Sequence, residues 1–396
     1  MRTDEYHPET IRYVEKTSPA YRKKLGQFFT PKNLREELLL MVPRLVRPKV
    51  LDPSCGTGEF LLSAREHFIE PELYGWEIDQ KLVEIARHII PQAHIEQADA
   101  LQKPLKEEFD IVLGNPPYFE FKPNRELKAK FKEVIWGRPN IYAFFIFLGL
   151  KVLKPGGYLA YVVSSSMNNG AYFKKLREFI MRTADIVHMK VLENPYIFEG
   201  VNHTFQLLVL RKGPNTGRYI FTMNGITIFT DRAEELKRLF ESSTTLHELG
   251  YRVQTGKIVW NQNKKLLTND SSQIPLIWAH NIVSGRLMLH NKADKPQYIK
   301  SHVFDTGPAI VVRRIVGHPK HSGSIEAAIV PPGFKFLAEN HVNVIYPPAG
   351  ASLQELEKIV RSLNSPRAQA AVNMITGNTQ ISKTELERLF PIRLTT

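Results

Sequence analysis

The chain alternates between short apolar runs and longer stretches in which apolar residues recur every three or four positions. Short apolar runs bounded by turn residues predict buried strands, and the longer period predicts amphipathic helices. We therefore expect strands at residues 50–52, 73–76, 94–97, 110–114, 158–166, 186–191 and 204–210. The expected helices are residues 33–42, 59–68, 80–89, 141–153, 172–182 and 233–242.

Strands and helices alternate through residues 50–182, which predicts a parallel sheet with helices on both faces. The last two strands have no helix between them, so we expect an antiparallel pair at the sheet edge. Residues 141–150, IYAFFIFLGL, are the most apolar run, but they are too short to span a bilayer and predict a buried helix. The predicted fold class is α/β, with a Rossmann-like sheet of seven mostly parallel strands.

Polar residues with ligand chemistry follow the first three strands. Asp52 ends the first strand, and a turn containing Gly56 and Gly58 lets a ligand approach the backbone. This turn lacks the third glycine of a dinucleotide fingerprint and the Gly-Lys-Ser/Thr of a P-loop. Glu77 ends the second strand, where an acidic residue can bind ribose hydroxyls, and Asp99 after the third strand can accept from an adenine amine. One such carboxylate would suit a surface or a helix cap, but three in succession predict a nucleoside site.

The strand at residues 110–114 is followed by Asn115-Pro116-Pro117-Tyr118. Two consecutive prolines stop both helix and sheet and fix the backbone, so the Asn amide, the Pro carbonyl and the Tyr ring form one rigid arrangement. The amide oxygen and the carbonyl can accept the two hydrogens of an exocyclic amine, while the ring stacks on a flat heterocycle. A proline-rich turn with a surface tyrosine is the alternative interpretation, and the neighbouring motifs must decide.

The 396 residues suggest two domains or one large one. The net charge of +13 and the pI of about 9.5 favour a polyanionic partner, either nucleic acid or an anionic membrane surface. The single cysteine, Cys55, excludes a disulfide within the chain and favours a reducing compartment. The first residues do not resemble a signal peptide, and the histidines lack ligand spacing, so we expect a cytoplasmic protein without a metal site.

Motifs in a fixed order carry a family resemblance: LGQFFTP, LDPSCGTGEF, GWEID, ADAL, DIVLGNPPY, GGYLAYVVSSS and IFEGVNHTFQLLVL. This series resembles the DNA adenine-N6 methyltransferases of restriction–modification systems, in the class whose S-adenosylmethionine motifs all precede the target-recognition domain. The resemblance covers about residues 20–212. It implies a methyltransferase catalytic domain at residues 1–243 and an α+β DNA target-recognition domain at residues 244–396.

The resemblance implies that S-adenosyl-L-methionine is the cofactor. Thr30 would contact its methionine part, Glu77 its ribose, and Asp99 its adenine. Asp52 and the glycine turn would hold the methionine and sulfonium region. The residues that the resemblance assigns to the cofactor are Thr30, Asp52, Ser54, Cys55, Gly56, Gly58, Glu77, Ile78, Asp99, Ala100 and Asn115.

The resemblance assigns Asn115, Pro116 and Tyr118 to the target adenine and counts Pro117 with them as catalytic. The N6 amine of the adenine would donate to Asn115 Oδ1 and to the Pro116 carbonyl. The base cannot be reached inside a duplex, so it must flip out and stack on Tyr118. The methyl sulfonium is already activated, so alignment is enough, and no covalent nucleophile or dedicated base is required. A second aromatic side chain on the other face of the base is assigned to Phe198, with Phe205 as the alternative.

Residues 251–320 contain eleven Lys or Arg and three Asp or Glu, a local net charge of +8. Asn, Gln and Arg side chains read base edges, whereas Lys and Arg contact phosphates. A solvated basic face over core tryptophans is the alternative interpretation, and we assign Trp260 and Trp278 mainly to packing. The expected DNA-contacting residues are Lys257, Asn261, Asn263, Lys264, Arg313 and Arg314.

Three other functions are compatible with parts of the sequence. A protein-glutamine N5 methyltransferase shares NPPY and the sheet but lacks LGQFFTP and a basic C-terminal domain. An RNA base methyltransferase would use a basic domain equally well, and a non-catalytic DNA-binding subunit would not need an intact NPPY. We expect a monomer that acts on double-stranded DNA in a bacterial or archaeal cytoplasm, without a membrane partner. Any cognate restriction endonuclease would be a separate protein.

Overall fold

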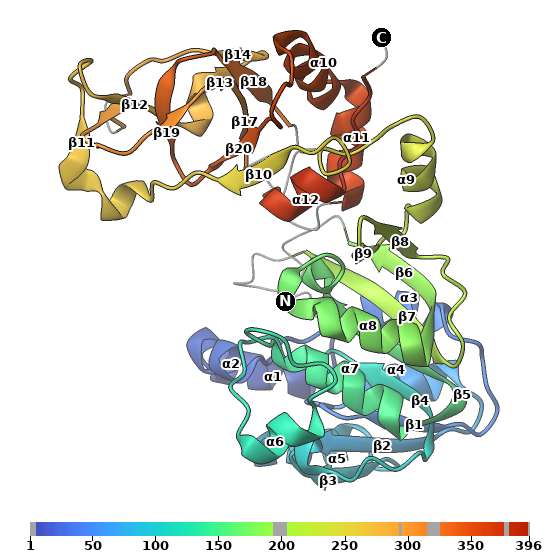
Figure 1. The fold of residues 1–396 in the computed structure, drawn as a ribbon. Helices are drawn as coiled ribbons and strands as arrows, with labels where there is room; N and C mark the ends of the chain where they lie inside the picture. Colours follow the sequence, from blue (N-terminus) through green and yellow to red (C-terminus); the bar gives the residue numbers. More distant parts are fainter. Residues whose placement is uncertain (1–4, 193–203, 293–294, 315–324, 376–379, 395–396) are drawn as a thin grey trace. The chain divides into compact units, whose positions relative to one another are not determined.

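A computed structural model describes residues 5–192, 204–292, 295–314, 325–375 and 380–394 (Figure 1). Their contacts divide the chain into two compact units, Met1–Ile220 and Phe221–Thr396, and each is described by itself. Among the described residues, no helix combines the length and the apolar character needed to cross a membrane.

The first unit is built on a seven-stranded sheet with the order β3-β2-β1-β4-β5-β7-β6. The strands from β3 to β5 pair in parallel, and β7 runs antiparallel to both of its neighbours, β5 and β6. The predicted sheet of seven mostly parallel strands is therefore confirmed. The strands are β1 (Lys49–Asp52), β2 (Glu72–Glu77), β3 (His94–Gln97), β4 (Phe109–Gly114), β5 (Leu153–Ser164), β6 (Ala184–Val191) and β7 (Phe205–Lys212).

Helices cover both faces of this sheet (Figure 1). Ile111 and Val162 belong to the core that includes residues of α3, α4 and α5. Side chains alternate along a strand, so Val112 and Leu159 point to the other face, where they lie against Gly149 of α7. Eleven of the twelve residues of α7 are buried, as its apolar sequence predicts. The helices are α3 (Lys32–Leu40), α4 (Glu59–His67), α5 (Gln80–Ile89), α7 (Ile141–Val152) and α8 (Lys174–Thr183).

Two N-terminal helices, α1 (Pro8–Lys16) and α2 (Pro19–Leu25), were not expected from the sequence. Each begins with a proline, which suits the first helical position because its missing N–H would have no partner there. The side chain of Ser18 accepts a hydrogen bond from the Tyr21 amide and caps α2. The Ser-Pro start signal was thus present in the sequence, but the short, charged segments around it show little apolar periodicity.

The second unit contains a four-stranded antiparallel sheet, β10-β20-β17-β18, and a five-stranded sheet, β11-β15-β12-β19-β16. The predicted combination of segregated helices and sheets is confirmed. The strands are β10 (Arg252–Thr255), β11 (Leu267–Thr268), β12 (Ile274–Ile277), β15 (Tyr298–Ile299), β16 (Asp305–Thr306), β17 (Ala309–Arg313), β18 (Ala327–Val330), β19 (Lys335–Ala338) and β20 (Val342–Tyr346). The helices are α9 (Ala233–Phe240), α10 (Leu353–Leu363), α11 (Pro366–Ile375) and α12 (Lys383–Arg388).

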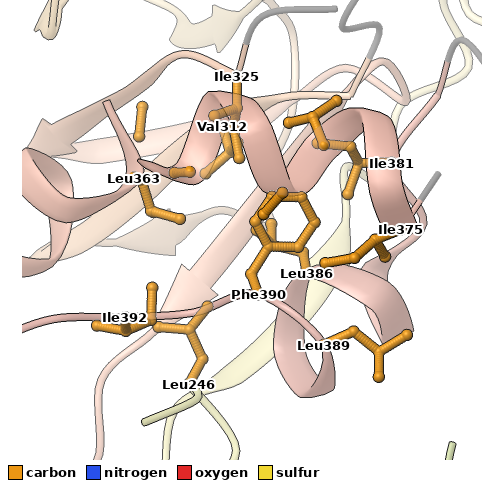
Figure 2. Close-up of a cluster of buried hydrophobic side chains, with 14 of the residues drawn as sticks. Leu246, Val312, Ile325, Leu363, Ile375, Ile381, Leu386, Leu389, Phe390 and Ile392 are labelled. Carbon is orange, nitrogen blue, oxygen red and sulfur yellow. The ribbon is translucent and has the colours of Figure 1, made fainter. Parts of the chain in front are cut away.

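The main core of the second unit lies between its C-terminal helices and one face of the four-stranded sheet (Figure 2). Ile310 and Val312 of β17 point into this core, whereas the alternating Ala309 and Val311 belong to a separate cluster on the other face. Phe390, which follows α12, is completely buried in the main core.

The main core also contains residues that precede the predicted domain boundary. Three of them come from the elements that precede residue 243. They are Phe221 of β8 (Ile220–Met223), Ile228 of β9 (Ile226–Phe229) and Leu236 of α9. The compact units therefore divide between residues 220 and 221, not at the expected 243. A short amphipathic helix shows by its pattern that it packs on a core, but the pattern does not show which core.

We predict that Phe390→Ala lowers the free energy of unfolding of the second unit by about 3–5 kcal/mol, because it leaves a cavity in a fully packed core. Leu353→Ala on α10 is the control, since Leu353 is exposed and should change stability by less than about 0.5 kcal/mol. Urea unfolding followed by tryptophan fluorescence measures the free energy of unfolding of both variants. Equal effects of the two substitutions would contradict the described core.

Candidate active site

Polar residues gather at the carboxyl ends of four neighbouring strands of the first unit. Asp52 ends β1 and Glu77 ends β2, while Asp99 lies just after β3 and Asn115 directly after β4. The strand order β3-β2-β1-β4 makes these strand ends neighbours along one edge. The structure thus brings together the residues that the sequence assigns to a nucleoside site, at the edge where open α/β sheets bind ligands.

The glycine turn is attached to the end of β2. Gly56 donates its amide to Glu77 Oε2 at 2.9 Å, and Cys55 donates its amide to the Trp76 carbonyl at 3.0 Å. Gly56 and Gly58 have φ angles of +54° and +89°, a left-handed conformation that side chains disfavour. Among the described residues, a Cβ atom placed on Gly56 would have only Phe29 within 4 Å, at 3.8 Å, so the turn is not tightly covered at this point.

Asp52 is buried at the base of the turn and accepts the amide of Ser54 at 3.0 Å. Burial, with a smaller contribution from the nearby Glu77, raises the pKa of Asp52 to about 8 and outweighs the Ser54 hydrogen bond, which lowers the pKa. The thiol of Cys55 is buried beside it, and burial raises the pKa of that thiol as well. Without a cation nearby, Asp52 is thus largely protonated at neutral pH.

The other side of the site is formed by residues after β2 and β3. Glu77 Oε1 accepts the amide of Asp79 at 2.9 Å, so both carboxylate oxygens of Glu77 are oriented by backbone amides. Ile78 is 66% exposed, which is unusual for an apolar side chain beside a polar site. Asp99 caps a short helical turn through the Leu101 amide at 3.0 Å, and Ala100 is buried in that turn.

The Asn115 side chain is held by the N-terminal motif LGQFFTP. Its Nδ2 donates to the Phe28 carbonyl at 2.8 Å, so Oδ1 is the acceptor end of the amide. Gly26 of the same motif lies directly against NPPY, because a Cβ there would be 2.8 Å from Pro117 Cβ. Pro116 is buried in this contact region. LGQFFTP therefore fixes both the backbone and the amide of NPPY.

The Tyr118 hydroxyl lies within hydrogen-bonding reach of Asn115 Oδ1 and of the Val162 carbonyl. Burial raises the pKa of this hydroxyl well above its ordinary value, so it keeps its proton and donates to one acceptor at a time. The Tyr118 ring packs edge-on against Phe205, with 5.1 Å between ring centroids, and lies 5.9 Å from Tyr142.

The structure describes one of the two candidates for the aromatic residue on the other face of the target base. Phe198 lies outside the described residues. Phe205 is completely buried at the start of β7 and supports the Tyr118 ring from within the core. Its position beneath Tyr118 gives Phe205 a packing role in this arrangement.

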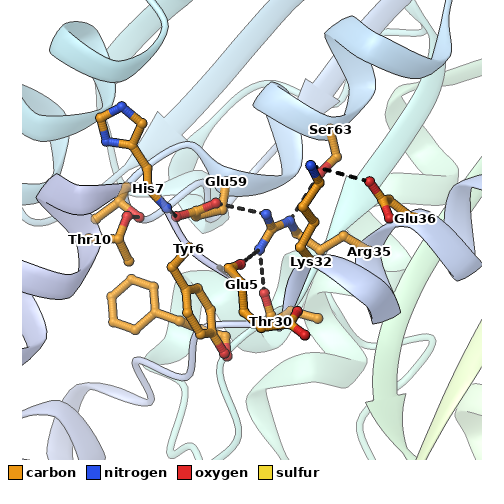
Figure 3. Close-up of polar contacts among 12 residues, drawn as sticks. Glu5, Tyr6, His7, Thr10, Thr30, Lys32, Arg35, Glu36, Glu59 and Ser63 are labelled. Carbon is orange, nitrogen blue, oxygen red and sulfur yellow. Dashed lines mark hydrogen bonds and ion pairs between the residues drawn. The ribbon is translucent and has the colours of Figure 1, made fainter. Parts of the chain in front are cut away.

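Thr30 is buried, with 3% of its surface exposed, and among the described residues its hydroxyl has no hydrogen-bond partner. A buried hydroxyl without a partner is costly, so it suggests a ligand atom. Its carbonyl accepts from Arg35, which is paired with Glu59 (Figure 3). We did not identify Arg35, Glu59 or the Phe28 carbonyl from the sequence, because a buried ion pair and a backbone acceptor leave no motif.

The predicted DNA-contacting residues lie in the second unit and differ in exposure. Asn261 and Lys264 are exposed, and Lys264 lies over the Trp260 ring at 5.2 Å. Lys257 pairs with Asp305 at 2.7 Å. Asn263 donates to the Val259 carbonyl at 2.9 Å.

The two predicted arginines are engaged within the second unit. Arg313 donates to the carbonyls of Ala279, at 3.0 Å, and of Ile282, and pairs with Glu326 at 3.2 Å. Arg314 donates to the Asn340 carbonyl at 3.2 Å. Both arginines thus support the fold of the unit, whatever else they contact.

The chain is similar in sequence to known DNA methyltransferases. A family model described as N-6 DNA Methylase matches residues 12–258. The modification methylase CviBIII of Paramecium bursaria Chlorella virus NC1A is 26% identical over 79% of this chain and 80% of its own length. The type II methyltransferase M.CvrRI of Paramecium bursaria Chlorella virus XZ-6E is 26% identical over 96% of this chain and 97% of its own. A modification subunit of a type I restriction enzyme from Vibrio vulnificus YJ016 aligns with a TM-score of 0.45 at 20% identity, covering 52% of this chain and 48% of its own.

We predict that Asp52→Asn stabilises the ligand-free protein increasingly as the pH rises. The folded-state pKa of Asp52, about 8, lies above its ordinary value of 3.8, so the stability that its protonated form provides is present at low pH and lost as the pH rises to 8. Asparagine stays neutral and can still accept the Ser54 amide. Thermal unfolding of both proteins should be measured between pH 5 and 9. The difference between their unfolding midpoints should widen up to about pH 8 and then level off. A difference that stays constant with pH would contradict the prediction.

Proposed function

Because the chain belongs to the N-6 DNA methylase family, we propose that it transfers a methyl group from S-adenosyl-L-methionine to N6 of an adenine in double-stranded DNA. The target adenine is flipped out of the duplex for the reaction. The chain acts as the modification methyltransferase of a restriction–modification system, and any endonuclease of that system is a separate protein.

One contact carries this proposal. A Cβ placed on Gly114 would lie 2.7 Å from Asp52 Oδ1, so the end of β4 touches the carboxylate at the base of the glycine turn. Asn115, the next residue, therefore lies beside the site assigned to the methyl donor. Direct transfer requires the accepting nitrogen, the methyl group and the sulfur to be in line, and this adjacency supports such an alignment.

The orientation of Asn115 supports an amine as the acceptor. Asn115 Nδ2 donates to the Phe28 carbonyl, so Oδ1 is the acceptor of this amide and can take a hydrogen from N6 once the Tyr118 hydroxyl releases it. The Pro116 carbonyl, whose orientation is restricted by the following Pro117, accepts the second hydrogen. Two acceptors on one amine favour a pyramidal nitrogen whose lone pair is available to attack the methyl group.

The residues present fit S-adenosyl-L-methionine, which supplies an activated methyl group when bound. The unpartnered Thr30 hydroxyl suits its methionine carboxylate or amine, and the oriented Glu77 carboxylate suits its ribose hydroxyls. The exposed Ile78 provides an apolar surface for its adenine. A cationic ligand beside Asp52 would stabilise the carboxylate form and lower its raised pKa.

Tyr118 must change its hydrogen bond when the target base enters. Its hydroxyl now competes for Asn115 Oδ1, the acceptor assigned to the target amine. The Val162 carbonyl offers the hydroxyl a second acceptor within reach, so releasing Asn115 does not leave a buried donor unpaired. The ring then serves as a stacking surface for the base.

The second unit supplies target recognition, with residues 244–396 as the DNA-reading part and the compact core beginning at Phe221. The exposed Asn261 and Lys264 are suited to contact bases and phosphates. Arg313 and Arg314 are candidates whose substitution would also disturb the fold, because each binds backbone carbonyls.

The proposal is tested with the purified chain, methyl-labelled S-adenosyl-L-methionine and duplex DNA, followed by digestion to nucleosides. We expect label in N6-methyladenine only, and Asn115→Ala should abolish transfer while cofactor affinity changes by less than about threefold, since it removes a contact made to the target. RNA and protein substrates serve as controls. Label on cytosine, RNA or protein in place of adenine would refute the proposed reaction.

We predict that Tyr118→Phe retains base flipping and methylation, because phenylalanine keeps the stacking ring and removes the competing hydroxyl. Tyr118→Ala should lose about 1–3 kcal/mol of stacking on the extruded base. Fluorescence of 2-aminopurine at the methylated position, located first by sequencing modified DNA, measures both variants. If Tyr118→Phe lost as much signal as Tyr118→Ala, the hydroxyl would be the essential group.

A further inference from the structure

A buried ion pair lies behind the glycine turn. Arg35 of α3 and Glu59 of α4 are joined at 2.8 Å between Nη2 and Oε2, and their side chains are only 2% and 6% exposed (Figure 3). Replacing a buried ion pair by apolar residues of similar volume is often neutral or stabilising, so stability alone is a weak reason for this pair. Its contacts suggest another role.

Arg35 links two segments assigned to the cofactor. Its Nη1 donates to the Thr30 carbonyl at 2.5 Å, and its Nε donates to Ser63 Oγ at 3.0 Å. Thr30 carries the buried hydroxyl without a partner among the described residues. Glu59, the partner of Arg35, directly follows Gly58 of the glycine turn. The guanidinium thus joins the backbone of Thr30 to the first residue after the turn.

Other contacts tie the N-terminal segment to the same turn. The His7 amide donates to Glu59 Oε1 at 2.8 Å, so both oxygens of Glu59 are engaged from residues that precede the sheet. The Thr10 hydroxyl donates to the Thr57 hydroxyl at 2.8 Å. These contacts hold the segment against the turn from outside, while Arg35 positions Thr30 on the inside.

We propose that Arg35 and Glu59 form a positioning pair that fixes the Thr30 backbone against the glycine turn and thereby sets the affinity for S-adenosyl-L-methionine. This inference rests on the proposed function, because it uses the assigned cofactor site. The pair does not touch the reacting atoms; it acts by placing Thr30. It therefore affects cofactor binding more than the methyl transfer that follows.

The shape of arginine is central to this role. Its planar fork reaches the Thr30 carbonyl, Ser63 and Glu59 at once. A lysine carries a point charge on a single stem and can keep the ion pair with Glu59 without holding the Thr30 carbonyl in the same geometry. An apolar pair of similar volume fills the same space but cannot donate a hydrogen bond to the Thr30 carbonyl.

The experiment compares full-length variants by calorimetric titration with S-adenosyl-L-methionine and by thermal unfolding. In the double variant Arg35→Met, Glu59→Leu, we expect a midpoint of unfolding close to that of the wild type and a Kd raised about tenfold, within the usual range of coupling between linked sites. Arg35→Lys should fold and raise the Kd by a smaller factor. Ser63→Ala, the matched control, removes one Arg35 contact that does not involve Thr30 and should leave the Kd unchanged.

Steady-state kinetics separates this role from a general loss of structure. The double variant should show a raised KM for S-adenosyl-L-methionine and an unchanged kcat at saturating cofactor, as expected when binding alone is weakened. A folded double variant with the wild-type Kd would overturn the proposal, as would a Ser63→Ala effect as large as that of the pair. If the double variant does not fold, Arg35→Lys decides, and its wild-type Kd would likewise overturn the proposal. Failure of the wild-type chain to bind the cofactor would refute the proposed function itself, and the inference with it.

Discussion

The hydrogen bond from Asn115 Nδ2 to the Phe28 carbonyl decides which face the amide presents to the pocket. A primary amide offers an acceptor on one side and two donors on the other. If the amide were turned over, its donors would face the hydrogens of an amine and repel them. One backbone carbonyl, 87 residues earlier in the chain, thus sets the orientation of the amide to which we assign the target amine. The close approach of Gly26 to Pro117 keeps that carbonyl within reach.

Polar groups in the candidate site largely satisfy one another. Glu77 is oriented by the amides of Gly56 and Asp79, and Tyr118 has two acceptors within reach. Asp52 avoids the cost of a buried charge by holding a proton. The protein itself therefore orients most of these polar groups, which lowers the cost of ordering them on binding. The Thr30 hydroxyl is the exception within the described part of this site.

Much of this arrangement could be predicted from the sequence, because strand patterns, glycine turns and NPPY are local signals. The seven strands and the carboxylates at their ends follow from apolar runs and from the rule that parallel strands end at one edge. The contacts of Phe28, Arg35 and Glu59 could not be predicted, since they join residues far apart and depend on side-chain geometry. The compact units divide after residue 220 and not at residue 243, because the sequence pattern of a short amphipathic helix, α9, does not reveal which core it packs on. Arg313 illustrates the same limit: the charge was evident in the sequence, but its engagement with Glu326 and two carbonyls was not.

The N-terminal segment has a consequence for how the chain acquires its structure. Thr10, His7 and Phe28 find their partners 47, 52 and 87 residues later. During synthesis these residues leave the ribosome well before the glycine turn, α4 and NPPY, which hold their partners, and α1 and α2 are too short to persist alone. Their contacts can therefore form only after the turn and the end of β4 have been made. The candidate site is thus assembled from two parts of the sequence that are synthesised at different times.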